Sequence, residues 1–373
     1  MLKVMTILGT RPEIIRLARV IDRLDRYAEH VLVHTGQNFD YELNRIFFDE
    51  LGIREPDHFL DAAGSSPAET IGNVIAKIDP VLEREAPAAV LILGDTNSSL
   101  AAISAKRRHI PIFHMEAGNR CFDQRVPEET NRKIVDHIAD INLPYSELAR
   151  QNLMREGLPA DRVIKTGSPL FEVIAHYMDQ IYASSILARQ GLTAHKYFVV
   201  SAHREENVDS PEGLKKLGEV LNRLAGEYDC PVVMSVHPRT RKHLDAFGLK
   251  IDPRVRLLKP LGYFDYVWLQ MQARVVLSDS GTISEESSIL NFPALNLRET
   301  HERLEGMEEG AVMMVGMSWS RIQQSITILC DQARDKIRLI RPVAEYQMPN
   351  VSDKVLRIIL SYIDYVNRVV WNK

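Results

Sequence analysis

The sequence predicts an α/β protein built from two doubly wound parallel sheets, one in each half of the chain. Short apolar runs alternate with longer amphipathic runs through both halves of the sequence. The apolar runs show little alternation of polar and apolar residues, which is typical of strands that helices bury on both faces. With 373 residues the chain is longer than one hydrophobic core usually supports, so we expect two domains.

The first half of the chain repeats the order of strand followed by helix. A proline stands near the first turn of the first expected helix, where its missing N–H group is tolerated. Strands are expected at KVMTIL, HVLVHT, AVLIL, IPIFHM and INLPY, and helices over residues 12–26, 41–51, 68–85, 98–108 and 128–139. This series predicts a first domain over residues 1–167.

A second series begins after a helical segment over residues 169–190 and predicts a second domain over residues 168–350. Its strands are expected at YFVVSAH, PVVMSVH, VRLLKP, RVVLSDS and PALNLR, with helices between them. The last long helical pattern, over residues 351–370, has no strand after it. Open α/β sheets bind ligands beyond the carboxyl ends of their strands, so we expect two Rossmann-like domains that face one cleft.

Composition excludes several classes of protein. A net charge of -4 with 26% charged residues gives no basic face for nucleic acid, and the basic run KRRH (residues 106–109) is interpreted as a solvated helix end. Cys121, Cys230 and Cys330 lie far apart, which indicates neither zinc nor a disulfide framework. The start MLKVMTILGTRPE enters a strand at once, and no run reaches the roughly 18 apolar residues of a membrane span. We therefore expect a cytoplasmic protein that does not insert into membranes.

The motif GTRPE at residues 9–13 turns from the first expected strand into a helix. Backbone N–H groups at such a helix start suit an anion, and Arg11 adds a bidentate donor. An ordinary capped helix start explains this motif equally well. The glycine spacing is not GxGxxG, so the fingerprint of a dinucleotide site is absent. Arg303 is either a further phosphate ligand or a surface charge.

The motif SDSGTISEES at residues 278–287 is the corresponding turn of the second half. Ser280, Gly281 and Thr282 follow an expected strand and open a helix, so they offer hydroxyl and N–H groups to a diphosphate. One of the two glutamates that follow suits ribose hydroxyls. The alternative is a Ser/Thr helix cap with acids that complement the helix dipole. The position directly after a strand favours the binding role.

Four side chains are candidates for proton transfer: Asp95, Glu116, Glu128 and His203. Three end or closely follow expected strands, and Glu128 starts an expected helix. Taken singly, Asp95 and Glu128 also suit helix caps, and His203 suits a buried imidazole. Together they are the groups that proton transfer near neutral pH requires. The sequence shows no metal-ligand cluster and no GxSxG motif, so nothing indicates hydrolysis by a metal or a serine nucleophile.

An ordered set of motifs resembles the non-hydrolysing UDP-N-acetylglucosamine 2-epimerase family over almost the whole chain. The motifs are GTRPE, GDTNSS, HMEAGNR, PEETNRKIVDH, AHREEN, SDSGTISEES and THERLEG. The resemblance implies the glycosyltransferase-B fold, in which the last helix, here residues 351–373, returns to the first domain. It also implies a UDP-sugar substrate, a homodimer, and chemistry that needs neither a cofactor nor a metal.

The resemblance assigns roles to residues at matching positions of the motifs. Asp95, Glu116, Glu128 and His203 match the catalytic acids and histidine of the family. The positions that match nucleotide or active-site ligands are Arg11, Arg132, Leu261, Tyr266, Ser280, Gly281, Glu286 and Arg303. In this scheme the Tyr266 ring lies beside the uracil, and the Leu261 backbone contacts the base.

Three departures from the family pattern bear on the substrate. Arg16 stands where UDP-GlcNAc enzymes usually carry lysine, Thr282 replaces the second glycine of DSGG, and Leu304 replaces the proline of ERPE. HTGQNFDYELN and GNRCFDQRVPEETNRKIVDH resemble instead a capsule and O-antigen branch that makes UDP-N-acetyl-L-fucosamine from a 6-deoxy-L-talosamine nucleotide. The alternatives are UDP-GlcNAc/UDP-ManNAc epimerisation and UDP-2,3-diacetamido-glucuronate epimerisation.

The mechanism that the resemblance implies starts with elimination of UDP to a 2-acetamidoglycal. UDP then adds back while a proton reaches the other face of C2. Diphosphate binding by Arg11 and the helix start at Ser280 and Gly281 would stabilise the leaving charge. Two faces of C2 need two proton-transfer groups, and which acid serves each face stays open. A retaining glycosyltransferase is the alternative from another class, because it uses the same fold and the same nucleotide contacts.

Overall fold

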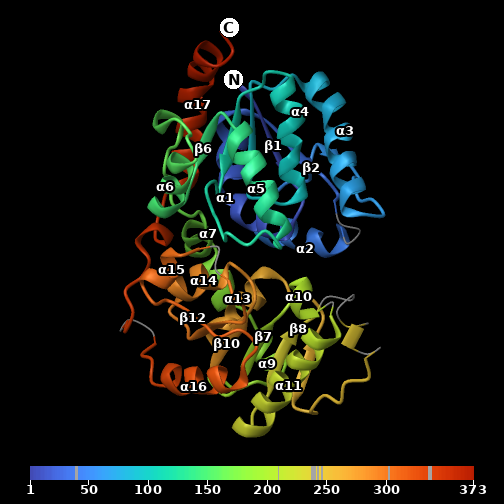
Figure 1. Ribbon diagram of the computed structural model, residues 1–373, viewed down its shortest axis with the longest axis vertical. Helices are drawn as coiled ribbons and strands as arrows, with labels where there is room; N and C mark the ends of the chain where they lie inside the picture. The colour runs from blue at the N-terminus through green and yellow to red at the C-terminus, as the bar shows by residue number, and fades with distance from the viewer. Residues whose placement is uncertain are drawn as a thin grey trace. The chain divides into compact units, whose positions relative to one another are not determined.

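The computed structural model describes residues 1–37, 41–208, 210–236, 241, 243–244, 247–300, 303–334 and 338–373. The chain divides into two compact units (Figure 1). The first unit contains residues 1–176 and 344–373, and the second contains residues 177–343. Each unit holds a six-stranded sheet in which every strand pair is parallel, so the predicted α/β fold class is confirmed.

The sheet of the first unit has the strand order β3-β2-β1-β4-β5-β6. Its strands are β1 (Lys3–Leu8), β2 (Glu29–His34), β3 (His58–Phe59), β4 (Ala89–Leu93), β5 (Ile112–Met115) and β6 (Ile141–Leu143). Its helices are α1 (Arg11–Tyr27), α2 (Tyr41–Leu51), α3 (Pro67–Glu85), η1 (Asn97–Ala101), α4 (Ala102–Arg107), α5 (Pro127–Ile138), α6 (Glu147–Arg155), η2 (Ala160–Arg162), α7 (Leu170–His176), η3 (Ala344–Tyr346) and α17 (Val351–Val369).

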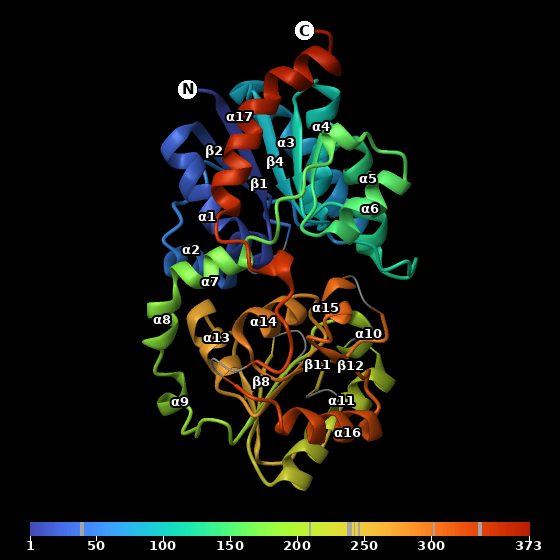
Figure 2. The same cartoon turned by 90° about the vertical axis from the view of Figure 1, so that its left-hand side faces the viewer.

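Helices cover both faces of this sheet, which explains why its strands are apolar throughout. Helices α3, α4 and α5 pack on one face through a shared apolar cluster, whereas α1 lies on the other face with α17 beside it (Figure 2). An ion pair of 3.1 Å between Arg23 Nε and Asp353 Oδ1 joins α1 to α17. The C-terminal helix therefore packs within the first unit.

The sheet of the second unit has the strand order β12-β11-β10-β7-β8-β9. Its strands are β7 (Phe198–Ser201), β8 (Val232–Ser235), β9 (Val255–Leu258), β10 (Val275–Ser278), β11 (Ala294–Asn296) and β12 (Met313–Met314). Its helices are α8 (Met178–Tyr182), α9 (Ile186–Arg189), α10 (Glu205–Val208), α11 (Pro211–Tyr228), α13 (Tyr263–Met271), α14 (Ile283–Leu290), α15 (Glu305–Glu308) and α16 (Trp319–Cys330). Numbered from its own first strand, this sheet has the same order as the first one.

Three local features differ from the sequence prediction. The segment expected as one helix over residues 98–108 begins as the 3₁₀ helix η1 and continues as α4. The segment over residues 169–190 forms three short helices, because α7 packs against α1 while α8 packs against α13. The two-residue edge strands β3 and β12 were not predicted, since so short a run carries no periodicity.

In both sheets the strands end at one edge, where the loops that carry the candidate residues begin. The register pairs Ile7 of β1 with Ile92 of β4, and Leu93 of β4 with Met115 of β5. In the second sheet Ser201 of β7 pairs with Ser278 of β10. Among the described residues, no helix has the length and apolar character needed to cross a membrane.

Candidate active site

Asp95 and Glu116 follow adjacent strands of the first sheet. Glu116 comes directly after β5, and Asp95 comes two residues after the end of β4. Because Leu93 pairs with Met115, the two acids leave the sheet at nearly the same level. The sequence analysis predicted that both acids end or closely follow expected strands.

Arg132 on α5 orients the Asp95 carboxylate. Its Nε and Nη2 atoms lie 2.8 and 2.6 Å from Oδ2 of Asp95. Its Nη1 donates to Oε2 of Glu129 at 3.1 Å, one turn back along the same helix. Asn131 adds a hydrogen bond of 3.0 Å to the Asp95 carbonyl oxygen. The guanidinium of Arg132 is buried, so these contacts fix it in one place.

Glu129 was not predicted, although it neighbours the candidate Glu128. Burial raises the pKa of Glu129, but hydrogen bonds from Cys121 and the charges of Arg132 and Lys133 outweigh this effect and lower it. Glu128 is half-buried in the first turn of α5. The i, i+3 spacing of Glu129 and Arg132 was the available sequence signal.

Glu116 has a left-handed backbone conformation, with φ of 64°. This region is strained for a residue with a side chain, typically by about 1–3 kcal/mol, and such strain gathers at functional sites. Nη1 of Arg16 lies 3.7 Å from Oε2 of Glu116, and Nδ2 of Asn119 donates to Oε1 at 3.3 Å. The buried Arg16 guanidinium in turn stacks over the Tyr145 ring at 5.8 Å. Arg16 therefore faces an acid of the candidate site.

A buried charge network supports the turn that carries Glu116. His114 Nδ1 lies 3.0 Å from Asp136, which also accepts from the Gly118 amide at 3.2 Å. Arg120 donates to the same carboxylate at 2.7 Å and to Glu156 at 2.6 Å. Burial lowers the pKa of His114, but its hydrogen bond with Asp136 outweighs burial and raises it. The other ring nitrogen, Nε2, donates to the Gly94 carbonyl oxygen at 2.8 Å.

The start of α1 carries an exposed arginine and a buried acid. Arg11 is exposed, and its guanidinium lies 5.7 Å from the centre of the Phe47 ring. Glu13 is buried and accepts hydrogen bonds from Gly9 N at 2.5 Å and Thr10 N at 2.9 Å. Burial raises the pKa of Glu13 to about 7, although these hydrogen bonds act in the opposite direction. The sequence analysis assigned no role to Glu13; the pattern Thr-x-x-Glu was the available signal.

In the second unit, His203 is held by an acid that the sequence analysis did not single out. Nδ1 of His203 lies 2.9 Å from Oδ1 of Asp279, the residue after β10. The Asp279 carboxylate also accepts the amides of His203 and Arg204 at 3.0 Å and the Asn207 side chain at 2.9 Å. Burial raises the pKa of Asp279, but the charge and hydrogen bonds of these donors lower it to about 2. Asp279 is therefore a charged acceptor throughout the physiological range.

The turn after β10 carries the predicted diphosphate residues. Ser280 Oγ lies 2.9 Å from Thr282 Oγ1, and the Ser280 amide donates to Ser278 Oγ at 3.1 Å. Thr282 is the N-cap residue of α14, and Gly281 lies between the two hydroxyl side chains. Backbone N–H groups at such a helix start suit an anion.

The two glutamates of α14 differ in their surroundings. Glu285 is buried and pairs with Arg303, so Arg303 is a buried, paired residue rather than a lone surface charge. Glu286 is half-buried, and Oε2 accepts from Gln270 Nε2 at 2.8 Å. Of the two acids, only Glu286 combines partial exposure with an oriented carboxylate.

Leu261 and Tyr266 lie on the segment that begins α13. Both side chains are partly buried against the apolar cluster formed by this helix, α14 and the sheet. Each therefore keeps part of its surface available to a ligand.

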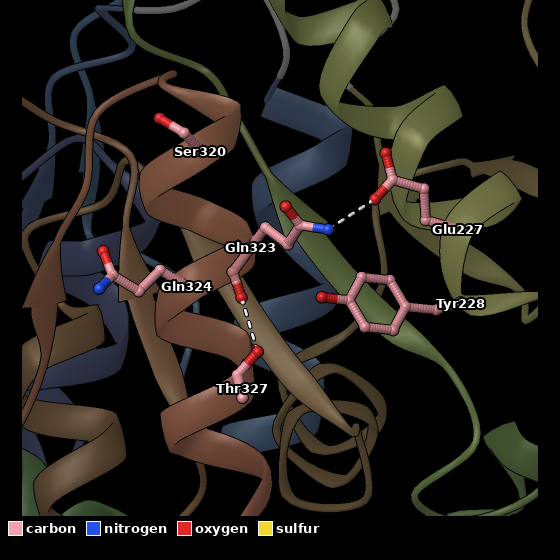
Figure 3. A pocket seen from close by; sticks show the side chains of 6 residues that line it. All are labelled: Glu227, Tyr228, Ser320, Gln323, Gln324 and Thr327. Atoms are coloured by element: carbon pink, nitrogen blue, oxygen red, sulfur yellow. Dashed lines mark hydrogen bonds between the residues drawn. The ribbon is translucent and has the colours of Figure 1, made fainter.

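A surface hollow of about 410 Å³ in the second unit lies away from these residues. Figure 3 shows its lining from α11 and α16, which consists of Glu227, Tyr228, Ser320, Gln323, Gln324 and Thr327. Tyr228 precedes β8, so this hollow lies toward the amino ends of the strands rather than the carboxyl edge. Within the described part of the chain, no group of three His, Cys, Asp or Glu side chains is arranged to hold a metal ion.

Two parallel doubly wound sheets with charged side chains at their carboxyl edges are typical of nucleotide-binding enzymes. A family model described as UDP-N-acetylglucosamine 2-epimerase matches residues 22–360. The chain therefore belongs to the UDP-N-acetylglucosamine 2-epimerase family and is an isomerase that acts on UDP-sugars, which confirms the resemblance seen in its motifs.

Relatives and solved structures agree with this assignment. The structure of UDP-N-acetylglucosamine 2-epimerase from Rickettsia bellii is 52% identical in sequence, with a TM-score of 0.94 and 100% of both chains covered. The Methanocaldococcus jannaschii UDP-GlcNAc 2-epimerase, in complex with UDP-GlcNAc and UDP, is 32% identical, with a TM-score of 0.88 over 97% of this chain and 100% of that one. The UDP-2,3-diacetamido-2,3-dideoxy-D-glucuronate 2-epimerase of Pseudomonas aeruginosa is 36% identical over 330 residues, which are 87% of this chain and 91% of the relative.

Proposed function

We propose that this chain epimerises a UDP-N-acetylhexosamine at C2 by eliminating UDP and adding it back. The C2 hydrogen of such a sugar is not adjacent to a carbonyl group, so a side-chain base cannot simply remove it. When the C1–O bond to UDP breaks, C1 gains positive character and the C2 hydrogen becomes acidic. Loss of that proton gives a 2-acetamidoglycal, and the reverse steps deliver a proton to the other face.

One observation carries this proposal: Asp95 and Glu116 leave adjacent strands, and each faces an arginine. Two proton-transfer groups are the minimum for chemistry on both faces of C2. The paired arginines orient both carboxylates. In the proposed scheme Glu128 and His203 complete the set of proton-transfer groups.

The proposal assigns the UDP leaving group to residues at helix starts. Arg11 and the Ser280–Thr282 turn bind the diphosphate, because N–H groups and a guanidinium stabilise charge that develops as the C1–O bond breaks. Arg303 supports this region through its pair with Glu285. Glu286 binds the ribose and Tyr266 lies beside the uracil, with Leu261 contacting the base through its backbone.

For the sugar itself, we propose UDP-2-acetamido-2,6-dideoxy-L-talose, which would yield UDP-N-acetyl-L-fucosamine for surface polysaccharide synthesis. The segment GNRCFDQRVPEETNRKIVDH supports this choice. UDP-GlcNAc is the second candidate, because the solved structures from R. bellii and M. jannaschii are of UDP-GlcNAc 2-epimerases. We also propose a homodimer, which size-exclusion chromatography with light scattering tests directly.

The decisive experiment incubates the enzyme with single UDP-N-acetylhexosamines in deuterated water, without an acceptor and with a chelator. Proton NMR of the C1 and C2 signals then follows both epimerisation and deuterium entry. We expect deuterium at C2 of the product and a severe loss of exchange in Asp95→Asn. Asp79→Asn, which removes a carboxylate paired with Arg108 at the C-terminal cap of α4, is the matched control. A product that keeps its original C2 hydrogen rules out the mechanism, and turnover only after addition of an acceptor indicates a transferase.

A further inference from the structure

The buried carboxylate of Glu13 joins the loops after β1 and β4, the two central strands between which the chain order of the first sheet reverses. Oε2 accepts the amides of Gly9 and Thr10 at 2.5 and 2.9 Å, directly after β1. Oε1 accepts the hydroxyl of Thr96 at 2.5 Å, after β4. Ligands of doubly wound sheets bind at this reversal point.

Close packing at the start of α1 leaves this acid little freedom. A Cβ atom added to Gly9 would meet Thr35 Oγ1 at 2.0 Å and Ser98 Oγ at 2.3 Å, so the turn packs directly against the next loop. These two hydroxyls lie 2.7 Å from each other. The amides of Gly9 and Thr10 therefore depend on Glu13 as an acceptor fixed in place.

Thr96 immediately follows Asp95, and the other sides of this turn are also held. His114 donates to the Gly94 carbonyl oxygen at 2.8 Å, Asn131 donates to the Asp95 carbonyl oxygen at 3.0 Å, and Arg132 pairs with the Asp95 carboxylate. These three contacts come from β5 and α5. The contact from Glu13 comes from α1.

The second sheet has a buried acid at its own reversal point. Asp279 follows β10 and accepts hydrogen bonds from His203, Arg204 and Asn207, which follow β7. Strands β7 and β10 are adjacent and correspond to β1 and β4 of the first sheet. In both sheets, then, one buried carboxylate bonds the loops that follow the two central strands.

We propose that Glu13 is a positioning residue for Asp95, acting through the Thr96 hydroxyl. This role rests on the proposed function, because it gives the Glu13–Thr96 contact an effect on the C2 proton transfer. Enzymes can lose about 10²-fold in rate when a reacting group is misplaced by about 1 Å, so loss of this contact lowers kcat more than it changes KM. A helix cap alone has no such effect.

Glu69 provides a matched control for the capping contribution. It sits at the third position of α3, as Glu13 does in α1, and accepts the Ser65 amide at 2.7 Å. Both helices begin with a proline in the first turn. Glu69 is exposed and contacts none of the candidate residues through a described hydrogen bond. Glu69→Ala therefore removes a comparable cap without touching Asp95.

The test is a double-mutant cycle on C2 deuterium exchange with Glu13→Ala, Thr96→Val and the double variant. We expect Glu13→Ala to lower kcat about 10- to 100-fold while KM changes less than about threefold. In the Thr96→Val background we expect Glu13→Ala to lower kcat only about two- to threefold, because the Glu13–Thr96 contact is already absent. Glu13→Gln, which keeps one acceptor oxygen, recovers most of the lost rate, and Glu69→Ala stays within about twofold of wild type.

Two results overturn the inference while the proposed function stands. One is that Glu13→Ala lowers kcat equally in wild type and in Thr96→Val. The other is that Glu13→Ala lowers kcat no more than Glu69→Ala does. A wild-type enzyme without C2 exchange on any UDP-N-acetylhexosamine overturns the proposed function itself, and this inference with it. Thermal unfolding of each variant verifies that it folds. If Glu13→Ala does not fold, the rates of Thr96→Val and Thr96→Ser are compared instead. The serine variant keeps the hydroxyl, so we expect it to keep the wild-type rate while the valine variant loses rate. Equal rates for the two variants refute the inference.

Discussion

The ring of His203 is bound through Nδ1 to Asp279, whose Oδ1 lies 2.9 Å away. The same carboxylate accepts the backbone amides of His203 and Arg204, so the ring and the backbone that carries it are fixed by one acid. A histidine that donates from Nδ1 presents Nε2 as its proton-accepting atom. Half of the His203 side chain remains exposed.

Replacing Asp279 by asparagine should therefore disable His203 without removing it. The asparagine amide can donate to Nδ1 and stabilise the wrong tautomer, a change that costs about 10⁴-fold when it affects a catalytic histidine in another enzyme class. We expect Asp279→Asn to lower kcat for C2 exchange by about 10²- to 10⁴-fold. Rates of deuterium entry, measured by NMR at saturating UDP-sugar, give the value.

Asp252→Asn is the control for this substitution. Hydrogen bonds from Arg254 also lower the pKa of Asp252 to about 2, but this residue precedes β9 and lies at the opposite end of the sheet. It should keep the wild-type rate. If Asp279→Asn keeps it as well, the orientation of His203 does not limit the reaction.

The fold was predictable because its signal is local. Apolar runs such as AVLIL and FVVS have no polar face, and this pattern alone indicates strands covered by helices on both sides. Asp95, Glu116 and His203 could be selected for the same reason, since each follows such a run. The break of residues 169–190 into short helices could not be read from the sequence, because packing on α1 and on α13 decides it.

The supporting residues escaped prediction because their partners are distant in sequence. Glu13 bonds Thr96, and Asp279 bonds His203; nothing in the local pattern of either acid identifies that partner. In the sequence, both acids have the appearance of ordinary residues at a capped helix start. Only strand order brings the partners together, because β1 lies beside β4 and β7 beside β10.

Arg132→Lys should separate the orientation of Asp95 from its charge balance. Lysine keeps the positive charge but cannot contact both Asp95 and Glu129 with the planar group that the arginine uses. We expect kcat to fall about 10- to 100-fold with a smaller change in KM, measured by the same exchange reaction. Arg108→Lys, which alters a two-bond pair with Asp79, is the control. Equal rates for the two variants would show that Asp95 needs only a nearby cation.

Asp136→Asn should destabilise the first unit strongly. The carboxylate of Asp136 is the shared partner of His114 and Arg120, and all three side chains are buried. Removing one partner of a buried ion pair leaves uncompensated charge and typically costs about 3–5 kcal/mol. The free energy of unfolding in urea measures this cost. The control is Asp353→Asn, which removes a partly exposed partner of Arg23 and should lower the free energy of unfolding by about 1 kcal/mol or less. A similarly small loss for Asp136→Asn would contradict the expectation.

The pH dependence of stability tests the buried state of Glu13. Burial raises the pKa of Glu13 from 4.5 to about 7, so folding favours the protonated carboxyl. Its contribution to stability is therefore fully present below pH 4.5 and is lost as the pH rises through 7. The difference corresponds to about 3 kcal/mol.

Glu13→Gln lacks the titrating group, so its free energy of unfolding should gain about this amount relative to wild type between pH 4.5 and pH 8. Urea unfolding at several pH values gives the difference curve. The exposed control Glu69→Gln should show no such gain, because hydrogen bonds from Ser65 lower the pKa of Glu69 rather than raise it. A flat curve for Glu13→Gln would mean that the carboxyl titrates alike in the folded and unfolded chains.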